Sequence, residues 1–412
     1  MVVDADVKYS IFKIFLMNPA IEKMARMARK QPKYIIGLMS GTSLDGLDIA
    51  LCEVKDSGLD TQVSLTHFGT ASYNNETKKR LKAISSVPEV SMEEVCLLHS
   101  WLGNYHGQLI LDALADWDIA PAEIDCIASH GQTIYHAPKI QHRQEDMPNA
   151  TLQIGDGDHI AQTTGILTIS DFRQKHTAAG GEGAPMVSFV DRVLYTDETE
   201  DRILLNIGGI ANFTYLPASG QTITTDTGPG NTLIDAAAQQ YFSKDFDRDG
   251  AIAKIGAVNK KAVKALKADP YFRKPLPKTT GPEVFNLQWV DKLLYNAGVT
   301  DISPRDLIAS LTRLSAETIA DAINNILDEG QEPTIYVSGG GIHNPMMRNW
   351  IDELLPSCQL KNFADIGFDP DAKEAVLFAV LANEMLAGDG FPMDGNDPES
   401  PRINFGKISF PS

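Results

Sequence analysis

Apolar runs of strand length, separated by glycine-containing turns, begin near residue 34. The runs "YIIGLMS", "LDIALCEV" and "VSLTHFGTASY" follow one another with only short turns between them. Successive runs of this kind predict an antiparallel meander. The pattern becomes helical from about Ser91 to Trp117, where Ser91 and Glu94, three residues later, form a capping box that marks the start of the helix.

The same order of elements recurs in the second half of the chain. "DRILLNIGGIANFTYLP" predicts a strand, a glycine turn and a strand, and "QTITTDT" predicts a third strand. "TIYVSGGG" predicts a buried strand that enters a glycine turn, and "AKEAVLFAVLANEML" a final helix. A hairpin-led unit thus occurs twice, with no low-complexity linker, so we expect two α/β domains that pack across a cleft. The predicted divisions are an extension at 1–33, a first domain at 34–195 with a return segment at about 387–412, and a second domain at 196–386.

The bulk composition narrows the class of protein. The 412 residues suffice for two domains, and 22% charged with 43% hydrophobic residues is typical of a globular chain. A formal net charge of −18 argues against nucleic acid or an anionic membrane as a partner. No run reaches the ~20 apolar residues of a membrane span. Four widely spaced cysteines predict reduced thiols rather than a disulfide framework or a zinc site: Cys52, Cys96, Cys126 and Cys358.

Residues 1–33 do not continue the strand and helix pattern. A short apolar stretch, "IFKIFLM", precedes the basic segment "MARMARK", which reverses the order found in a signal peptide. We expect this segment to be either an extension upstream of the true start, at Met24 or Met27, or a small docking helix. In both cases the compact part of the protein is expected to begin near Tyr34.

Three glycine turns are the first candidates for chemistry. In "GLMSGTSLDGLDIAL" two strands flank a turn of small and hydroxyl residues, whose backbone N–H groups can approach an anion. The Walker pattern GxxxxGK[ST] is absent, so this turn taken alone fits an ordinary tight turn better than a phosphate cradle. Similar turns occur in "NIGGIAN" and "SGGGIHN". Because all three follow predicted buried strands in matched halves, we infer a nucleotide held between two domains.

Asp226 is the second candidate. It ends the β-branched run "TITTD" and precedes Gly-Pro-Gly-Asn and a helix-like stretch. Two interpretations carry equal weight from the residues alone. The carboxylate is either a reactive group beside bare backbone, or a helix cap or Asx turn ahead of Asn231.

Taken together, these segments resemble the anhydro-N-acetylmuramic acid kinases of the actin/hexokinase/Hsp70-like superfamily. The resemblance covers the chain from Tyr34 onward in family order. The matching segments include "MSGTSLDG", "SHGQT", "QIGDGDHIAQTTGI", "LNIGGIAN", "DTGPGNTLIDA", "FDRDGAIAKIG", "VSGGGIHN" and "AKEAVLFA". The fold implied is a two-domain, actin-like ATPase (ribonuclease H-like) fold with an interdomain cleft.

The activity implied is that of a cytoplasmic kinase that depends on ATP and Mg²⁺ and serves cell-wall recycling. Such an enzyme opens the 1,6-anhydro bridge of 1,6-anhydro-N-acetylmuramic acid with water and phosphorylates the freed O6, which gives N-acetylmuramic acid 6-phosphate. The resemblance also suggests a homodimer, for which the residues themselves hold no independent signal.

The resemblance also assigns roles to individual residues. Asp226 matches the family's catalytic base, and a carboxylate that takes a proton from the attacking water accelerates such steps by typically 10²–10⁴-fold. Asp226 and Glu374 are the candidate metal ligands. The other assignments divide by ligand. The nucleotide is expected at Gly41, Thr42, Ser43, Asp45, Gly208, Gly209, Gly339, Gly340 and Gly341, and the sugar at His130, Arg173, Asp226 and Glu374. For His130, which ends a predicted buried strand, a purely structural role fits as well as a sugar contact.

Three positions depart from the family pattern. The family's usual "DFRxxDxAxGGQGAP" is "DFRQKHTAAGGEGAP" here, so His176 and Glu182 replace an aspartate and a glutamine, and Pro282 replaces an arginine. These changes leave the sugar less certain than the phosphoryl transfer. A kinase for a bare anhydro sugar such as levoglucosan is the alternative, favoured if Arg173 faces away or is paired with Glu182. A non-catalytic nucleotide sensor would be expected to have lost Asp226 or the first glycine turn.

Overall fold

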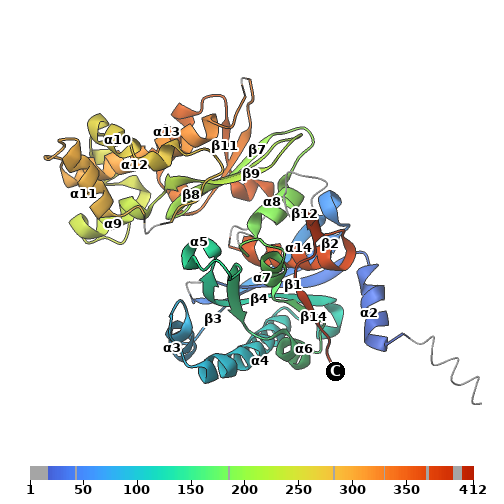
Figure 1. Cartoon of the computed structure of the whole chain (residues 1–412). Helices are drawn as coiled ribbons and strands as arrows, with labels where there is room; N and C mark the ends of the chain where they lie inside the picture. The colour runs from blue at the N-terminus through green and yellow to red at the C-terminus, as the bar shows by residue number, and fades with distance from the viewer. Residues whose placement is uncertain are drawn as a thin grey trace, which may run out of the picture. The chain divides into compact units, whose positions relative to one another are not determined.

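The chain forms two compact units in the computed structural model (Figure 1). The structure describes residues 17–41, 44–183, 186–281, 284–328, 330–367, 371–392 and 401–412. The first unit combines Met1–Leu194 with Asp371–Ser412, and the second is Tyr195–Pro370. Each unit is built around its own β-sheet, and each is described by itself below.

The sheet of the first unit has the order β14-β6-β4-β1-β2-β3, with β5 paired to β4. Its strands are β1 (Lys33–Ser40), β2 (Gly46–Lys55), β3 (Gln62–Ser72), β4 (Cys126–Ala137), β5 (Ala150–Ile154), β6 (Thr168–Ser170) and β14 (Lys407–Ser409). The pairs β1–β2 and β2–β3 are antiparallel, as the hydrophobic pattern predicted. The strands β4 and β6 continue the sheet in parallel with β1.

Helices cover this sheet. They are α2 (Pro19–Ala28), α3 (Asn75–Ile84), α4 (Met92–Asp116), α5 (Lys139–His142), α6 (Gly157–Thr164), α7 (Phe172–Ala178), α8 (Val187–Tyr195) and α14 (Lys373–Ala387), and a short ribbon pairs β12 (Phe391–Pro392) with β13 (Arg402–Ile403). The long predicted helix is α4, and Ser91 Oγ accepts the Glu94 N–H at its start. Leu102 and Ile110 of α4 are buried in one cluster with Leu38 and Ile49 of the sheet.

The last long helix corrects the predicted domain boundary. Residues 371–386 were predicted to belong to the second domain, but α14 packs on β1, β2 and β4 of the first unit. A side chain at Gly37 of β1 would collide with the Ala375 carbonyl, so strand and helix meet backbone to backbone. The chain therefore returns to the first unit about 16 residues earlier than the predicted 387, because a helix with a long apolar middle does not indicate which of two sheets it covers.

The N-terminal segment was predicted to be either an upstream extension or a docking helix. Residues 1–16 lie outside the described part of the chain. Residues 19–28 form α2, which Asn18 caps and which packs on α14. Met27 is buried, and just beyond the helix Lys30 Nζ pairs with Asp125 at 2.7 Å. The docking helix is therefore the interpretation that fits residues 19–28, and the compact fold begins before Tyr34.

The second unit repeats the sheet of the first. Its strands are β7 (Arg202–Ile207), β8 (Ile210–Leu216), β9 (Ile223–Pro229), β10 (Thr334–Ser338) and β11 (Gln359–Asn362), in the order β11-β10-β7-β8-β9. The pairs β7–β8 and β8–β9 are antiparallel, and β7, β10 and β11 are parallel. In the first unit the five strands β3-β2-β1-β4-β6 lie side by side, and in the second the five strands β9-β8-β7-β10-β11 do. If the five are numbered along the chain within each unit, both sheets have the order 3-2-1-4-5, with the second strand antiparallel to the first. This order is the ribonuclease H-like one, so the predicted actin-like duplication is confirmed.

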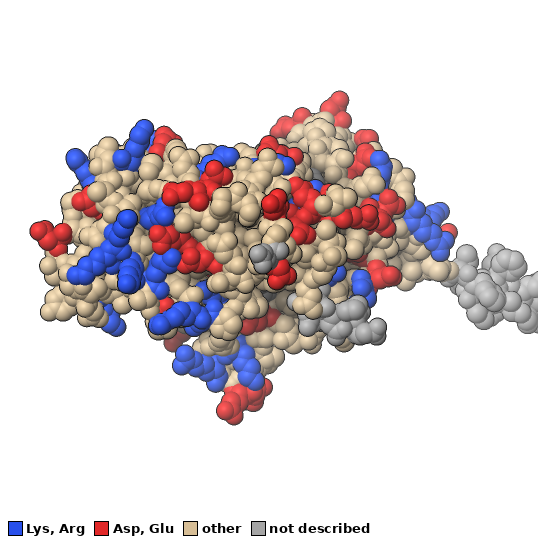
Figure 2. Space-filling view, turned by 90° about the horizontal axis from the view of Figure 1, so that it is seen from above, with Lys and Arg blue, Asp and Glu red and all other residues tan. Residues whose placement is uncertain are grey.

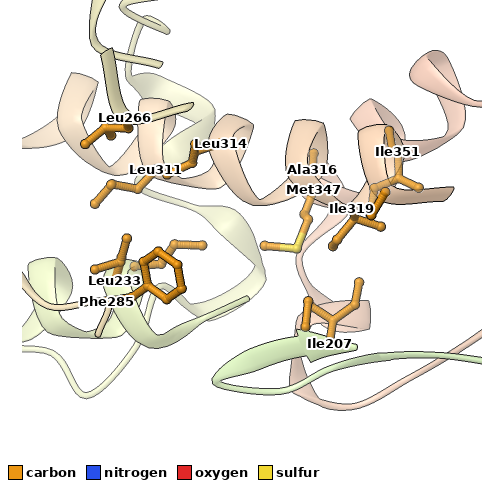
Figure 3. Close-up of a cluster of buried hydrophobic side chains, with 14 of the residues drawn as sticks. Ile207, Leu233, Leu266, Phe285, Leu311, Leu314, Ala316, Ile319, Met347 and Ile351 are labelled. Carbon is orange, nitrogen blue, oxygen red and sulfur yellow. The ribbon is translucent and has the colours of Figure 1, made fainter. Parts of the chain in front are cut away.

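The core of the second unit lies between its sheet and its helices (Figure 3). The helices are α9 (Thr232–Phe242), α10 (Lys260–Lys267), α11 (Leu287–Asn296), α12 (Pro304–Asn324) and α13 (Pro345–Leu354). The central helix α12 buries Leu311 and Ile319, and Ile207 of β7 and Met347 of α13 belong to the same cluster. The short 3₁₀ helices of the two units are η1 (Gly58–Asp60), η2 (Pro121–Glu123), η3 (Arg248–Gly250), η4 (Ala253–Ile255), η5 (Pro270–Arg273), η6 (Gly340–His343) and η7 (Phe363–Ile366).

The distribution of surface charges and the free cysteines agree with the prediction of a globular protein with reduced thiols. Lys and Arg are interspersed with Asp and Glu on the face that Figure 2 shows. Among the described residues, no helix combines the length and apolar character that a membrane crossing requires. All four cysteines are free thiols, and burial raises the pKa of Cys52 to about 12, which keeps that thiol protonated and unreactive.

Candidate functional site

The first glycine turn connects β1 to β2. Gly41 is partly exposed, and its carbonyl accepts hydrogen bonds from the Leu44 N–H at 3.2 Å and from Gln132 Nε2 at 3.2 Å. The side chain of Asp45 is 75% exposed, and its nearest charged partner is Lys78 at 3.6 Å. The predicted phosphate contacts Thr42 and Ser43 lie outside the described residues.

Arg173 and His130 form a pair on α7 and β4. Arg173 Nε donates to His130 Nε2 at 2.8 Å, and His130 Nδ1 donates to the carbonyl of Gly131 at 2.8 Å. The ring also packs on Phe378, with centroids 4.8 Å apart. Burial, with the nearby Arg173 charge, lowers the pKa of His130 to about 3, so the imidazole is neutral. Because both ring nitrogens are occupied, His130 positions Arg173, which fits the structural one of its two predicted roles.

Glu374 opens α14 near this pair. Its side chain is accessible to solvent, yet enough protein surrounds the carboxylate that desolvation raises its pKa. The Arg173 charge opposes this rise, and the negative charge of Asp48 adds to it. Asp48, on β2, accepts a hydrogen bond from Thr70 Oγ1 at 2.6 Å, and desolvation raises its pKa too. The first unit thus brings one guanidinium and two carboxylates into electrostatic contact.

Two of the three departures from the family pattern lie close together, His176 in the last turn of α7 and Glu182 in the loop that follows α7. His176 Nδ1 accepts the Gly183 N–H at 3.2 Å, and the carbonyl of Gly183 accepts from Arg173 Nη1 at 3.2 Å. The His176 ring stands edge-on to Phe189, with centroids 5.6 Å apart. Glu182 is exposed, and no ion pair joins it to Arg173 within the part of the chain that the structure describes. His176 therefore holds the loop, while the third departure, Pro282, lies outside the described residues.

The two glycine turns of the second unit converge. The carbonyls of Gly208 and Gly209, between β7 and β8, accept N–H groups from the segment before α9: Gly209 from Gly230 at 2.8 Å, and Gly208 from Asn231 at 2.8 Å. Asn231 Nδ2 also donates to the carbonyl of Ile207 at 3.2 Å. These bonds bring two separate stretches of sequence, 207–209 and 230–231, into one backbone-lined region.

The turn after β10 packs onto the same region. Gly339 has φ 83° and ψ 169°, a conformation that is essentially restricted to glycine. A side chain there would lie 2.7 Å from the Ile207 carbonyl oxygen, and one at Gly341 would collide with the Ile207 side chain. A side chain at Gly340 would meet only Asn231 Nδ2, at 3.8 Å. Gly339 and Gly341 are therefore required for close packing, whereas Gly340 faces open space.

Asp226 lies within β9, although the sequence predicted that the strand ends there. The ladder pairs Asn212 with Asp226 and Ala211 with Gly228, so Thr227 is an extra residue in a β-bulge. A bulge bends its strand and changes the direction of neighbouring side chains, which lets the strand continue past Asp226 to Pro229. The N-cap of α9 is Asn231, so the helix-cap interpretation of Asp226 is wrong.

The carboxylate of Asp226 is held from one side only. Its backbone N–H donates to the Lys278 carbonyl at 2.9 Å, and its Oδ2 accepts the Thr280 N–H at 2.8 Å. Among the described residues, its Oδ1 accepts no hydrogen bond. The side chain is half-buried, and desolvation raises its pKa, against the opposing effect of the Thr280 hydrogen bond. Asp226 is therefore a fixed carboxylate with one free oxygen and increased basicity.

Few of these residues could act as ligands of a metal ion. Among the described ranges, no group of three or more His, Cys, Asp or Glu side chains is arranged to hold one. Mg²⁺ does not need such a group, because it commonly binds through one or two carboxylates, waters and substrate phosphates. The donors present in the first unit, Glu374 and Asp48, fit that type of site. The other predicted ligand, Asp226, belongs to the second unit.

Sequence reasoning missed two contributors to these sites. The first is the Lys278–Thr280 segment along β9, which belongs to the family-like stretch "PKTTGPEVFN" but holds Asp226 through its backbone, so that no side chain indicated the contact. The second is Gln132 on β4, whose amide holds Gly41. Gln132 belongs to the quoted segment "SHGQT", so its polar side chain in an otherwise buried strand was the available signal.

Comparison with known proteins gives full-length matches. A family model described as anhydro-N-acetylmuramic acid kinase matches residues 33–398. The chain is 48% identical over 400 residues to the anhydro-N-acetylmuramic acid kinase of Pseudoalteromonas atlantica, covering 96% of this chain and 100% of that protein. The corresponding protein of Caldanaerobacter subterraneus is 38% identical over 374 residues, which cover 89% of this chain and 94% of that protein.

Solved structures are similar at low sequence identity. The activator of 2-hydroxyisocaproyl-CoA dehydratase from Clostridium difficile, with bound ADPNP, matches with a TM-score of 0.37 and 10% identity, covering 86% of this chain and 95% of that one. A hexokinase from Schistosoma mansoni complexed with glucose matches with a TM-score of 0.32 and 11% identity, covering 90% and 97%. The fold assignment given above comes from the strand order of each unit.

Proposed function

Because this chain belongs to the anhydro-N-acetylmuramic acid kinase family, we propose that it phosphorylates 1,6-anhydro-N-acetylmuramic acid with ATP while water opens the 1,6-anhydro bridge. The product is N-acetylmuramic acid 6-phosphate. The observation that carries this proposal is the match to the family over nearly the full chain, together with an intact Asp226 whose Oδ1 is free among the described residues. The proposed setting is cell-wall recycling in the cytoplasm, and the proposed assembly is a homodimer.

Asp226 is the proposed general base. Its free Oδ1 takes a proton from a water molecule as the water oxygen bonds to the anomeric carbon, and the bond between that carbon and O6 breaks. The electron pair left on O6 then attacks the γ-phosphorus of ATP, and ADP leaves. A usual glycosidase needs a second carboxylic acid to protonate its leaving oxygen, whereas here the phosphoryl group accepts the negative charge. The raised pKa of Asp226 makes it a better proton acceptor at neutral pH.

ATP is the proposed ligand of the glycine turns. Gly41 and its turn supply backbone donors to the γ-phosphate, and the open space at Gly340 accommodates another part of the nucleotide. Glu374 and Asp48 are the carboxylates proposed to hold Mg²⁺, which neutralises charge on the transferring phosphoryl group when it is bound. No covalent intermediate is required, because positioning and charge neutralisation account for most of the rate in phosphoryl transfer.

Arg173 is proposed to bind the lactyl carboxylate of the sugar. Its Nε and one Nη1 hydrogen are held by His130 and Gly183, and its Nη2 has no partner among the described residues. A planar guanidinium fixed in this way presents its remaining donors to a carboxylate at little cost in side-chain entropy. The alternative substrate, levoglucosan, would be favoured if Glu182 formed an ion pair with Arg173, because Arg173 would then have no donors left for a sugar carboxylate. The absence of such an ion pair among the described residues supports the carboxylate-bearing sugar.

Substrate preference tests this proposal directly. The purified protein with Mg-ATP is expected to form ADP and a 6-phosphorylated sugar from 1,6-anhydro-N-acetylmuramic acid. Activity should be at least about 10-fold lower on 1,6-anhydro-N-acetylglucosamine, which lacks the lactyl group, and on levoglucosan, since lost charge-assisted hydrogen bonds cost about 1.5–3 kcal/mol. Coupled ADP release and mass spectrometry of the sugar product measure both quantities.

The variant Arg173→Lys provides the matched control, because it keeps the positive charge but loses the planar guanidinium with its several N–H donors. It should raise KM for the lactyl sugar and reduce the preference over 1,6-anhydro-N-acetylglucosamine, with little change in KM for ATP. Equal turnover of all three sugars by the unmodified protein would contradict the assignment of Arg173. Turnover of levoglucosan alone would overturn the proposed substrate.

The pH dependence of turnover should report the Asp226 carboxyl group. A general base acts only when it is deprotonated, and burial raises the pKa of Asp226 above the ordinary value of about 3.9. Turnover should therefore be constant near neutral pH and fall on acidification at a higher pH than an unperturbed aspartate would cause. Glu374 also has a raised pKa, so the profile of Glu374→Gln distinguishes the two. If the acidic limb disappears in that variant, the limb does not belong to Asp226.

A further inference from the structure

A chain of four buried side chains connects α4 to the first glycine turn. His106 Nε2 and the Tyr73 hydroxyl lie 2.7 Å apart, and that hydroxyl lies 2.8 Å from Ser40 Oγ. Ser40 Oγ donates to Gln132 Oε1 at 2.6 Å, and Gln132 Nε2 donates to the carbonyl of Gly41 at 3.2 Å. Each of the four side-chain residues is at most 3% exposed. The only end of the chain that reaches a partly exposed group is Gly41.

The fold brings these four residues together from β1, β4, α4 and the position that follows β3. Ser40 ends β1 opposite Gln132 of β4, at an irregularity of the parallel ladder after Leu38. Gly131 supplies the positive φ of 77° at that irregularity. Tyr73 follows β3 directly, and its own backbone N–H donates to the carbonyl of Asp45 at 2.9 Å. Tyr73 is thus bonded to both ends of the turn, by its backbone at Asp45 and through Ser40 and Gln132 at Gly41.

The donors in this chain can be assigned from one end. Gln132 Nε2 donates to the carbonyls of Gly41 and Thr133, so its Oε1 must accept, and Ser40 supplies that proton. The other acceptor near Ser40 Oγ, the Gly46 carbonyl, is more distant, at 3.5 Å. Tyr73 must then donate to Ser40 and accept from His106.

The state of His106 agrees with this direction. Burial lowers the pKa of His106 to about 3, so its ring is neutral and carries one N–H. That hydrogen is on Nε2, and Nδ1 has no partner among the described residues. All hydrogen bonds in the chain therefore point the same way, toward the turn, and each polarises the next.

We propose that this hydrogen-bonded network positions the backbone of Gly41, just after β1, for ATP, with Tyr73 as its central positioning residue. The inference rests on the proposed kinase function. Burying polar side chains is costly unless they are hydrogen-bonded to one another, as these four are. The network ends on Gly41 and fixes the direction of its carbonyl. A backbone group fixed in advance binds its ligand without a further loss of conformational entropy.

The variant Tyr73→Phe tests this role, because it removes one hydroxyl and keeps the ring. KM for ATP is expected to rise about 10-fold, the size of effect that loss of a buried hydrogen bond produces, while KM for the anhydro sugar stays within about twofold. Tyr105→Phe is the matched control. The ring centroids of Tyr105 and Tyr73 are 6.0 Å apart, and the Tyr105 hydroxyl does not take part in the hydrogen bonds between His106 and Gly41. This control should leave both KM values unchanged.

A second pair of variants separates positioning from stability. His106→Gln keeps an N–H donor near the Nε2 position and should preserve KM for ATP, whereas His106→Leu should raise it as Tyr73→Phe does. Ser40→Ala combined with Tyr73→Phe should have less than the sum of the two single effects on KM for ATP, since both break one chain. A merely structural role would lower the melting temperature without changing the ratio of the two KM values.

Two results would overturn the inference while leaving the kinase function intact. One is a Tyr73→Phe enzyme with the KM for ATP of Tyr105→Phe, and the other is an equal rise of KM for ATP and for the sugar. Failure of the proposed function is a different result, because the unmodified protein would then form no 6-phosphorylated sugar from ATP.

Discussion

Replacing Asp226 by asparagine should reduce kcat at least about 100-fold, because general bases typically contribute 10²–10⁴-fold. The side-chain oxygen of asparagine can still accept the Thr280 N–H that Asp226 Oδ2 accepts at 2.8 Å. The local fold should therefore persist, and only the proton acceptor is lost. KM for ATP should stay within about twofold, and steady-state kinetics with Mg-ATP and 1,6-anhydro-N-acetylmuramic acid measure both values.

Asp235→Asn is the matched control for this variant. Asp235 is another half-buried carboxylate of the second unit, and burial with the charge of Asp247 raises its pKa to about 6. It has no part in the proposed mechanism, so its loss should leave kcat within about threefold of the unmodified value. An Asp226→Asn enzyme that keeps a tenth of the activity would show that the base has been wrongly assigned.

Alanine substitutions at Gly339 and Gly340 should have opposite consequences despite their adjacency. Gly339→Ala forces a side chain onto a glycine-only conformation and against the Ile207 carbonyl. Such strain and overlap together should cost about 3 kcal/mol of unfolding free energy, or a melting temperature ~10 °C lower. Gly340→Ala meets only Asn231 Nδ2 at 3.8 Å, so its stability should change by less than ~0.5 kcal/mol.

Gly340→Ala, which should hardly change stability, should in contrast weaken ATP binding. A methyl group there occupies the space proposed for the nucleotide, so KM for ATP should rise severalfold while the protein remains as stable as the unmodified one. Thermal unfolding and ATP titration, done on both variants, separate the two effects. Unchanged ATP affinity in Gly340→Ala would remove Gly340 from the nucleotide site, and an unaffected melting temperature in Gly339→Ala would contradict the packing argument.

Local sequence patterns predicted most of the secondary structure. The β1–β2–β3 meander, helix α4 with its Ser91 cap, and the second hairpin β7–β8 all occur where periodicity and turn residues placed them. The two errors in the fold share one cause. The end of a strand at Asp226 and the domain assignment of α14 depend on non-local partners, namely Asn212 across the ladder and Gly37 on β1.

The roles of single polar residues were harder to predict. For His130 the sequence left a sugar contact and a structural role open, and contact with Arg173 on one nitrogen and Gly131 on the other makes it a positioning residue. His176 departs from the family pattern, yet its hydrogen bond to the Gly183 N–H ties the loop after α7 back to that helix. A histidine in a sequence shows neither of its partners, because both come from other elements or from the folded backbone.

By itself, the sequence determined the order of strands and helices, the two matched halves and the identity of Asp226, because these depend on residue type and near neighbours. Only the tertiary structure decided which oxygen of Asp226 is free, which unit α14 completes, and that Tyr73 holds both ends of the Gly41 turn. The physical reason is that hydrogen bonds and burial depend on contacts between residues that are distant in the sequence, and local sequence patterns do not show which distant residues are in contact.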